Sequence, residues 1–217
     1  MARKTIAEIR KDEIIKAFFK VVSEKGIAKA TIREVATAAG CNRGILHHYF
    51  AGKEEIIKGA VDYVMTIYKA ELLEGLSECD SATSRIKYLV SWFFDLCRFN
   101  LDFSRAWMEF VNLSKYDPTV SSTIRDCYEE VKGVFAKTIR EGIRSGEFRK
   151  LNPVVTANVI MANLEGATLL WVVDAEKTPV KNMGKQIEDM ITKYLASGQL
   201  NFVGICKGTA RRAPTKN

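Results

Sequence analysis

The chain has 217 residues, of which 47% are hydrophobic, and this is enough for one sizeable core or for a small module joined to a larger one. The formal net charge of +7 is unevenly spread, because residues 1–53 carry 11 Lys and Arg against 5 Asp and Glu, whereas residues 54–200 carry 18 against 21. A basic N-terminal segment favours a polyanionic partner, although an excess of this size is also typical of a solvated face.

Several classes of protein are disfavoured by what the sequence lacks. The opening MARKTIAEIRKDEIIKAFF alternates charged and apolar residues, unlike a secretory signal, and no window approaches the roughly 20 apolar residues of a membrane span. We therefore expect a cytoplasmic protein without a membrane partner. The five cysteines form no CxxC pair, so we expect no disulfide framework, metal site or cofactor. An all-α enzyme is a third possible class of function, and the absence of HExxH, GxSxG and phosphate-loop motifs argues against it.

The spacing of apolar residues predicts an all-α protein. Only 4 Pro occur, and apolar residues recur at three- and four-residue steps between positions 5 and 197. About nine helices are predicted: residues 5–25, a short helix between Thr31 and Gly40, then 43–50, 53–78, 81–101, 102–114, 119–145, 153–175 and 180–196. We divide the chain into a three-helix module over residues 1–52, a larger helical domain over 53–198 and a basic, frayed tail over 199–217.

The second and third predicted helices form a helix-turn-helix. Thr31 and Glu34 have the spacing of a capping box, and Gly40 ends the helix that they begin. Asn42 can cap the next helix after a break of three residues, and Leu46 and Phe50 point inward as its anchors. Two short helices joined by a tight turn also occur in packed helical domains, so the pattern alone leaves that alternative open.

The outward side of the third helix has the chemistry of DNA recognition. Arg43 can donate two hydrogen bonds to guanine in the major groove, and adjacent histidines can contact bases or phosphates, although such histidines are more often plain surface residues. Gly44 leaves room for a close backbone approach. The predicted DNA-binding residues are Thr31, Arg33, Asn42, Arg43, Gly44, His47, His48, Tyr49 and Lys53.

The run GIAKATIREVATAAGCNRGILHHYFAGKEEII resembles the DNA-binding segment of the TetR family of bacterial transcriptional regulators. The family pattern has a Gly, a Thr followed by an apolar residue, an Ala-Gly turn, a Gly-x-Leu recognition helix, an aromatic pair and a Lys that begins the next helix. The matching positions are Gly26, Thr31, Ile32, Val35, Ala36, Ala39, Gly40, Gly44, Leu46, Tyr49, Phe50, Lys53 and Ile56. Three residues depart from it: His47 stands in place of the usual tyrosine, Cys41 of valine and Asn42 of serine.

This resemblance covers about the first quarter of the chain. It implies that Thr31, Arg43, Gly44, His47, His48, Tyr49 and Lys53 face DNA. The strings HHYF, RAWMEF and NLEGATLLW are more weakly similar to the BetI-like branch of the family. The resemblance also implies that the later helices enclose an effector cavity and form a dimer interface.

The larger domain contains candidate effector-binding residues. Aromatic residues on its helices more often belong to the core than line a pocket. DNA binding alone, however, does not require a further domain of this size that is rich in large apolar side chains. Glu165 stands in the apolar run VIMANLEGATLLWVV, where a carboxylate needs an Arg, a dimer partner or a cationic effector as its counterpart. The predicted lining residues are Trp92, Phe93, Cys97, Trp107, Phe110, Glu165 and Trp171.

The function predicted from these features is a repressor that binds a palindromic operator as a homodimer and is released by a small-molecule effector. Helices 153–173 and 180–195 are the dimerisation candidates, with Ala157, Ala162, Gly166 and Ala167 permitting close approach. The alternative is a DNA-binding protein whose helical domain serves only dimerisation or a protein partner, without small-molecule control.

Overall fold

The computed structural model describes residues 5–98 and 101–196, so the predicted tail over 199–217 lies outside the described residues. Within that part, the chain is all-α, as predicted, and contains no strand beyond an isolated bridge between Phe148 and Ala196. The helices are α1 (Ile6–Lys25), the short 3₁₀ helix η1 (Ile27–Lys29), α2 (Ile32–Ala38), α3 (Arg43–Tyr49), α4 (Lys53–Ser77), α5 (Ala82–Arg98), α6 (Leu101–Leu113), α7 (Pro118–Ser145), α8 (Pro153–Val173) and α9 (Val180–Leu195).

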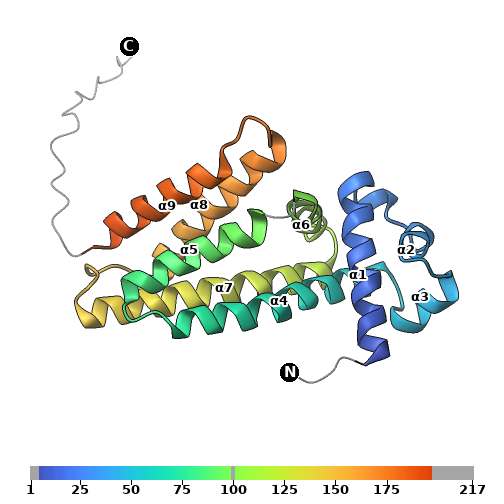
Figure 1. Ribbon diagram of the computed structural model, residues 1–217, viewed down its shortest axis with the longest axis horizontal. Coiled ribbons are helices and arrows are strands. Elements are labelled where there is room, and N and C mark those ends of the chain that lie inside the picture. Colours follow the sequence, from blue (N-terminus) through green and yellow to red (C-terminus); the bar gives the residue numbers. More distant parts are fainter. Residues whose placement is uncertain (1–4, 99–100, 197–217) are drawn as a thin grey trace, which may run out of the picture.

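The three N-terminal α-helices stand at one end of an elongated bundle (Figure 1). Helices α4 and α7 run along the bundle, and α5, α8 and α9 lie beside them, with extensive contacts between α7 and α8 and between α5 and α9. Helix α6 lies between α1 and the rest of the bundle and packs mainly against α1. This position makes α6 the principal link between the two ends of the molecule.

Helix α8 is the most apolar of the described helices. By length and composition alone, Pro153–Val173 could cross a membrane, with a mean hydropathy of 1.3. It also packs against α7 and α9, and Ile160, Met161 and Leu164 are buried there. Its apolar character therefore follows in part from its place in the core of the larger domain.

Helix capping differs from the sequence prediction at one point. Thr31 accepts a hydrogen bond from the Glu34 amide at 3.3 Å, as a capping box requires, but the Glu34 carboxylate pairs with Lys25 at 2.5 Å instead of reaching back. The ammonium at the end of α1 offers a full charge, which competes with a single backbone N–H. A complete capping box occurs instead at Thr5 and Glu8, at the start of α1.

The N-terminal core extends past the predicted boundary at residue 52. Its buried cluster contains side chains of α1, α2 and α3, but also Ile56 and Ile57 of α4, Phe110 of α6 and Ile124 of α7. The helix-turn-helix therefore shares its buried cluster with residues of α4, α6 and α7. The boundary at residue 52 stays a prediction.

Aromatic side chains make the contact between α1 and α6. Phe18 stacks on Phe110 with ring centroids 5.8 Å apart and planes 9° apart, and Phe19 contacts both Phe103 and Phe110. The same two helices are also joined by a hydrogen bond of 2.6 Å from the Ser23 hydroxyl to the Asp102 carboxylate. Because Phe18 and Phe110 are fully buried, a movement of α6 must displace α1 or leave a void.

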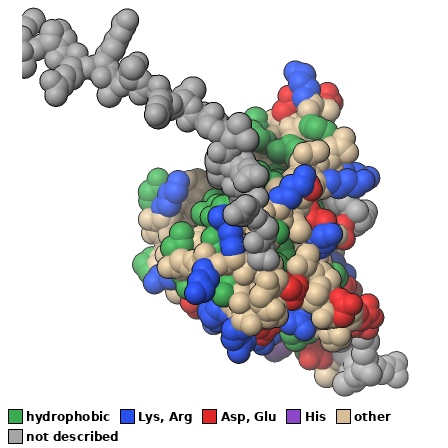
Figure 2. All heavy atoms as spheres, turned by 90° about the vertical axis from the view of Figure 1, so that its left-hand side faces the viewer, with side chains coloured by type: hydrophobic (Ala, Val, Ile, Leu, Met, Phe, Trp, Pro, Cys, Tyr) green, Lys and Arg blue, Asp and Glu red, His purple; other side chains and the backbone are tan. Residues whose placement is uncertain are grey.

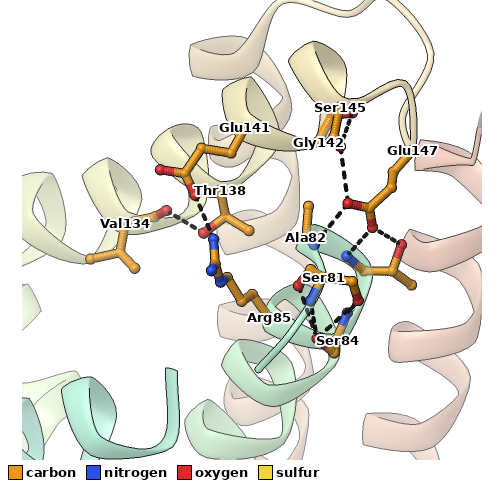
Figure 3. Close-up of polar contacts among 11 residues, drawn as sticks. Ser81, Ala82, Ser84, Arg85, Val134, Thr138, Glu141, Gly142, Ser145 and Glu147 are labelled. Atoms are coloured by element: carbon orange, nitrogen blue, oxygen red, sulfur yellow. Dashed lines mark hydrogen bonds and ion pairs between the residues drawn. The ribbon is translucent and has the colours of Figure 1, made fainter. Parts of the chain in front are cut away.

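The opposite end of the bundle carries charges of both signs. Figure 2 shows this end, where Lys and Arg side chains are interspersed with Asp and Glu and with apolar patches. At this end, Glu147 caps α5 from a distant part of the sequence (Figure 3). Its carboxylate accepts hydrogen bonds from the amides of Ala82 and Thr83 at 3.1 and 2.9 Å, while Ser81 accepts from the next amide. The first three amides of α5 are thus satisfied.

These bonds hold the pKa of Glu147 well below its usual range, at about 2, with the Thr83 amide as the largest cause. The ionised form is therefore favoured by folding. Its contribution is fully present above the ordinary glutamate pKa and is lost as the pH falls toward about 2. Glu147→Gln should lower the free energy of unfolding at pH 7 by about 1 kcal/mol, the usual size of a helix cap. Urea unfolding from pH 7 to pH 2 should show the two proteins converging, and a constant difference would contradict this role.

Candidate DNA-binding surface and effector site

The turn between α2 and α3 has a defined backbone geometry. Gly40 adopts a left-handed conformation with φ of 63°, and its amide donates to the carbonyl of Thr37 at 3.1 Å. The Cys41 amide donates to the carbonyl of Ala36 at 2.9 Å, which completes a Schellman motif. A side chain at position 40 would strain this backbone, so the glycine fixes the angle at which α3 leaves α2.

Helix α3 has one buried side and one exposed side. Leu46 is fully buried and Phe50, which follows the helix, is 4% exposed, as predicted for the anchors. Arg43, Gly44, His47 and His48 are all exposed. Tyr49 is half-buried, and its ring lies edge-on to that of His48, with centroids 5.0 Å apart. The polar side chains therefore remain free to meet a groove of DNA.

The predicted residues of α2 and the turn lie next to this surface. Arg33, Asn42, Arg43 and Gly44 line one shallow hollow together with Thr37, and Arg33 is exposed there. The Asn42 side-chain oxygen already accepts a hydrogen bond from the Ile45 amide at 2.9 Å, so Asn42 has a structural role as the cap of α3. The hydroxyl of Thr31 likewise caps α2. The Glu34 carboxylate nearby is paired with Lys25, so it does not offset the charge of Arg33 or Arg43.

Lys53 differs from the other predicted residues. It is half-buried, and its ammonium donates a hydrogen bond to the backbone carbonyl of Ile27 in η1. Burial lowers the pKa of this lysine, while the charges of Glu54 and Glu109 oppose that shift. An ammonium has three N–H groups, so this contact leaves others available for a phosphate.

A hydrogen-bonded chain of three side chains lies between α6, α7 and α8. The indole N–H of Trp107 donates to the Tyr128 hydroxyl at 3.2 Å, and that hydroxyl hydrogen-bonds to the carboxylate of Glu165. Burial raises the pKa of Tyr128, so its hydroxyl keeps its proton and acts as the donor. Burial also raises the pKa of Glu165 to about 6, and the bond from Tyr128 only partly offsets this.

The other predicted effector residues lie in two separate groups. Trp92, Phe93 and Trp171 belong to the core cluster of α5, α7, α8 and α9, and the Trp92 indole N–H is one of two buried side-chain polar atoms in the described chain without a hydrogen-bond partner. The side chain of Cys97 lies outside the described residues. The ring of Phe110 stacks on that of Phe18 of α1 and belongs to the buried cluster of the N-terminal helices.

An apolar face covers the outer side of α8 and α9. Its exposed large side chains are Val154, Val155, Val159, Leu169, Leu170, Val173, Met190 and Tyr194. Of the four small residues predicted to permit close approach, Ala162 and Gly166 are on the accessible side, whereas Ala157 and Ala167 are buried within the subunit. Among the described residues, no three His, Cys, Asp or Glu side chains are grouped so that they could hold a metal ion.

Two family profiles match the chain. The profile described as bacterial regulatory proteins of the tetR family matches residues 14–60, and that of the BetI-type transcriptional repressor C-terminal domain matches residues 82–196, which is more than half of the chain. The chain belongs to the TetR family. Members of this family are transcriptional regulators, and the BetI-type assignment of the C-terminal domain agrees with the weaker resemblance seen in the sequence.

Similar proteins agree with this TetR-family assignment. A BetI regulator of Burkholderia mallei is 24% identical over 90% of this chain and 98% of its own length. Another, from Stenotrophomonas maltophilia, is 26% identical over 56% of this chain, a match that spans 62% of that relative.

Solved structures of TetR-like proteins share the fold. A transcriptional regulator from Saccharomonospora viridis in complex with choline has a TM-score of 0.78 at 19% identity, covering 87% of this chain and 98% of that one. FadR from Bacillus subtilis in complex with stearoyl-CoA has a TM-score of 0.76, also at 19% identity, covering 85% and 98%.

Sequence reasoning missed three residues of this TetR-family chain that connect its parts. Tyr128 joins Trp107 to Glu165, and Asp102 and Glu109 of α6 bind Ser23 and Ile27 of the N-terminal helices. Nothing in the spacing of these residues distinguishes them from ordinary polar positions on an amphipathic helix. Their partners are tens of residues away in the chain, so only the packed structure identifies them.

The half-buried carboxylate of Glu165 makes stability depend on pH. Because its pKa is raised to about 6 in the folded chain, ionisation there costs stability, and this cost is present above pH 6 and absent below the ordinary glutamate pKa. Glu165→Gln should therefore be more stable than the wild type at pH 7.5 by about 2 kcal/mol. Thermal or urea unfolding should show this gain disappearing toward pH 4. The exposed Glu176, changed to Gln, is the control. A gain that does not vary with pH would place the Glu165 carboxylate in water.

Proposed function

We propose that this TetR-family regulator is a cytoplasmic repressor that binds a palindromic operator as a homodimer and dissociates from it when a small organic cation binds at Glu165. The observation that carries the DNA-binding part is the arrangement of α3. Leu46 and Phe50 fix its buried side, so Arg43 and His47 are presented to solvent on a surface with an excess of positive charge. Such a helix fits the major groove, where Arg43 can pair with guanine.

The apolar face of α8 and α9 supports the homodimer. Eight large apolar side chains are exposed on these two helices, which is more than isolated surface residues account for. A second copy of the same face would cover them through a two-fold axis. Two recognition helices related in this way would read half-sites separated by one helical turn of DNA, about 34 Å, or a multiple of it.

The surroundings of Glu165 favour a cation as the effector. A carboxylate that is largely removed from water needs a counter-charge, and no Arg or Lys among the described side chains shifts the pKa of Glu165. The aromatic rings of Trp107 and Tyr128 are close by and offer the faces that attract cations. The choline complex of a protein with the same fold supports this class of ligand, and the stearoyl-CoA complex of another shows that the fold also accepts anions.

Control of DNA binding would follow from linkage. A cation that binds better when the two recognition helices are wrongly spaced lowers operator affinity by its difference in binding energy, typically about 1–3 kcal/mol. Helix α6 provides the route, since Trp107 lies on the same helix as the aromatic contacts to α1.

Arg43 and Lys53 should differ in what their loss does to DNA binding. Arg43→Ala should cost about 1–3 kcal/mol on the operator and much less on random DNA, because it removes a base contact. Lys53→Ala should weaken binding to both and flatten the dependence of affinity on salt, because it removes a phosphate contact. Fluorescence anisotropy on both DNAs across a salt series measures this. Equal losses on random DNA for the two variants would defeat the assignment of Arg43 to base recognition.

A cation should release the protein from DNA where its neutral equivalent does not. We expect choline, or another quaternary ammonium ion, to lower operator affinity, while the isostere of choline with carbon in place of nitrogen has no effect. Glu165→Gln should abolish the difference between the two compounds, since the amide has no charge to pair with the cation. The measurement is operator binding during titration with each compound.

Two results of the same titration would contradict the cation proposal. Release only by neutral or anionic compounds would show that the effector is not a cation. If no small molecule alters operator affinity while a protein partner does, the larger domain serves dimerisation or partner binding alone.

A further inference from the structure

The backbone of Ile27 is held from two sides by side chains of the larger domain. Its amide donates to the Glu109 carboxylate of α6 at 3.2 Å, and its carbonyl accepts from the Lys53 ammonium at the start of α4. The Glu109 charge also acts on Lys53 directly, since it favours the charged form of that lysine. Ile27 belongs to η1, the short turn that leads from α1 into the helix-turn-helix.

We propose that Glu109 is a positioning residue for DNA binding: it fixes Ile27, and Ile27 in turn holds the Lys53 ammonium at the place from which it contacts a phosphate. A lysine side chain has four rotatable bonds, so an ammonium without an anchor spends little time at one place. One N–H bonded to a fixed carbonyl restricts it and leaves the remaining N–H groups for other partners. The inference rests on the proposed function, because Lys53 acts only if α3 and α4 meet DNA.

The position of Glu109 on α6 relates this contact to Glu165. Trp107, two residues earlier, is bonded to Tyr128 and through it to Glu165. The same helix is therefore linked to Glu165 through Trp107 and Tyr128, and to the anchor of Lys53 through Glu109. A shift of α6 would change the placement of Lys53 without any direct contact between effector and DNA surface.

Asp102 supplies a matched control. It is also a carboxylate of α6 bonded to an N-terminal helix, but its hydrogen bond of 2.6 Å comes from the Ser23 hydroxyl and not from the backbone of Ile27. If only the docking of α6 on α1 matters, loss of either carboxylate should have the same effect. If Glu109 acts through Lys53, only its loss should change the phosphate contact.

The experiment measures the affinity of the full-length protein for operator and random DNA across a salt series. The proteins compared are the wild type, Glu109→Ala, Glu109→Gln, Asp102→Ala, Lys53→Ala and the double variant Lys53→Ala with Glu109→Ala. Glu109→Ala should weaken binding to both DNAs by at least half of the loss seen for Lys53→Ala and reduce the salt slope by about one per subunit. This weakening is opposite to the effect of charge alone, because removing a negative charge near DNA should tighten binding. Glu109→Gln removes the same charge but keeps an oxygen for the Ile27 amide, so it should bind at least as tightly as the wild type.

In the Lys53→Ala background, the Glu109→Ala change should add nothing, because the residue that it positions is gone. Unchanged or tighter binding by Glu109→Ala, an additive double variant, or an equal loss of salt slope in Asp102→Ala would each overturn the inference. Should Glu109→Ala fail to fold, Glu109→Met, which is similar in size and lacks the acceptor, takes its place. If the wild type does not bind DNA, both the proposed function and this inference fail. If the wild type binds DNA and Glu109→Ala binds with the same affinity, this inference alone fails.

Discussion

The packing of α6 against α1 is the contact on which the rest of the molecule depends. Phe18, Phe19, Phe103 and Phe110 fill it, and two of these rings are fully buried. Interiors of proteins are close-packed, so such a contact transmits displacement instead of absorbing it. Without it, the helix-turn-helix would be joined to the larger domain mainly through α4, and a ligand near Glu165 would have a single path to DNA.

The helix-turn-helix itself could be predicted because its determinants are local. Gly40 is needed for a left-handed turn, Asn42 caps the helix that follows it, and Leu46 and Phe50 are four residues apart on one side of that helix. Each of these requirements is met within a few residues of chain. The same reasoning failed at Glu34, where a cation from the preceding helix competed successfully for a carboxylate that local spacing had assigned to the cap.

The contacts between distant segments could not be predicted. Helical periodicity identifies Phe110 as an inward-facing residue, but it does not say whether its neighbour is a ligand cavity or another helix, and the structure places it against Phe18. Glu147 caps α5 although more than sixty residues separate it from the amides that it binds. Ile27 offers only backbone groups to Glu109 and Lys53, so its part in the contact leaves no side-chain signature in the sequence.

In the proposed function, Glu165 connects the stability of the fold with the binding of the effector. A hydrophobic residue in its place would avoid the cost of burying a carboxylate, which the raised pKa reflects. A cation that paired with the carboxylate would remove that cost, and the same free energy would favour its binding. A neutral ligand of the same shape would leave the charge unpaired. Discrimination therefore needs no additional contact with the ligand. The bond from Tyr128 orients the carboxylate, and Tyr128 also accepts a hydrogen bond from Trp107. A ligand that changed these bonds would therefore act on α6, the helix that α1 packs against.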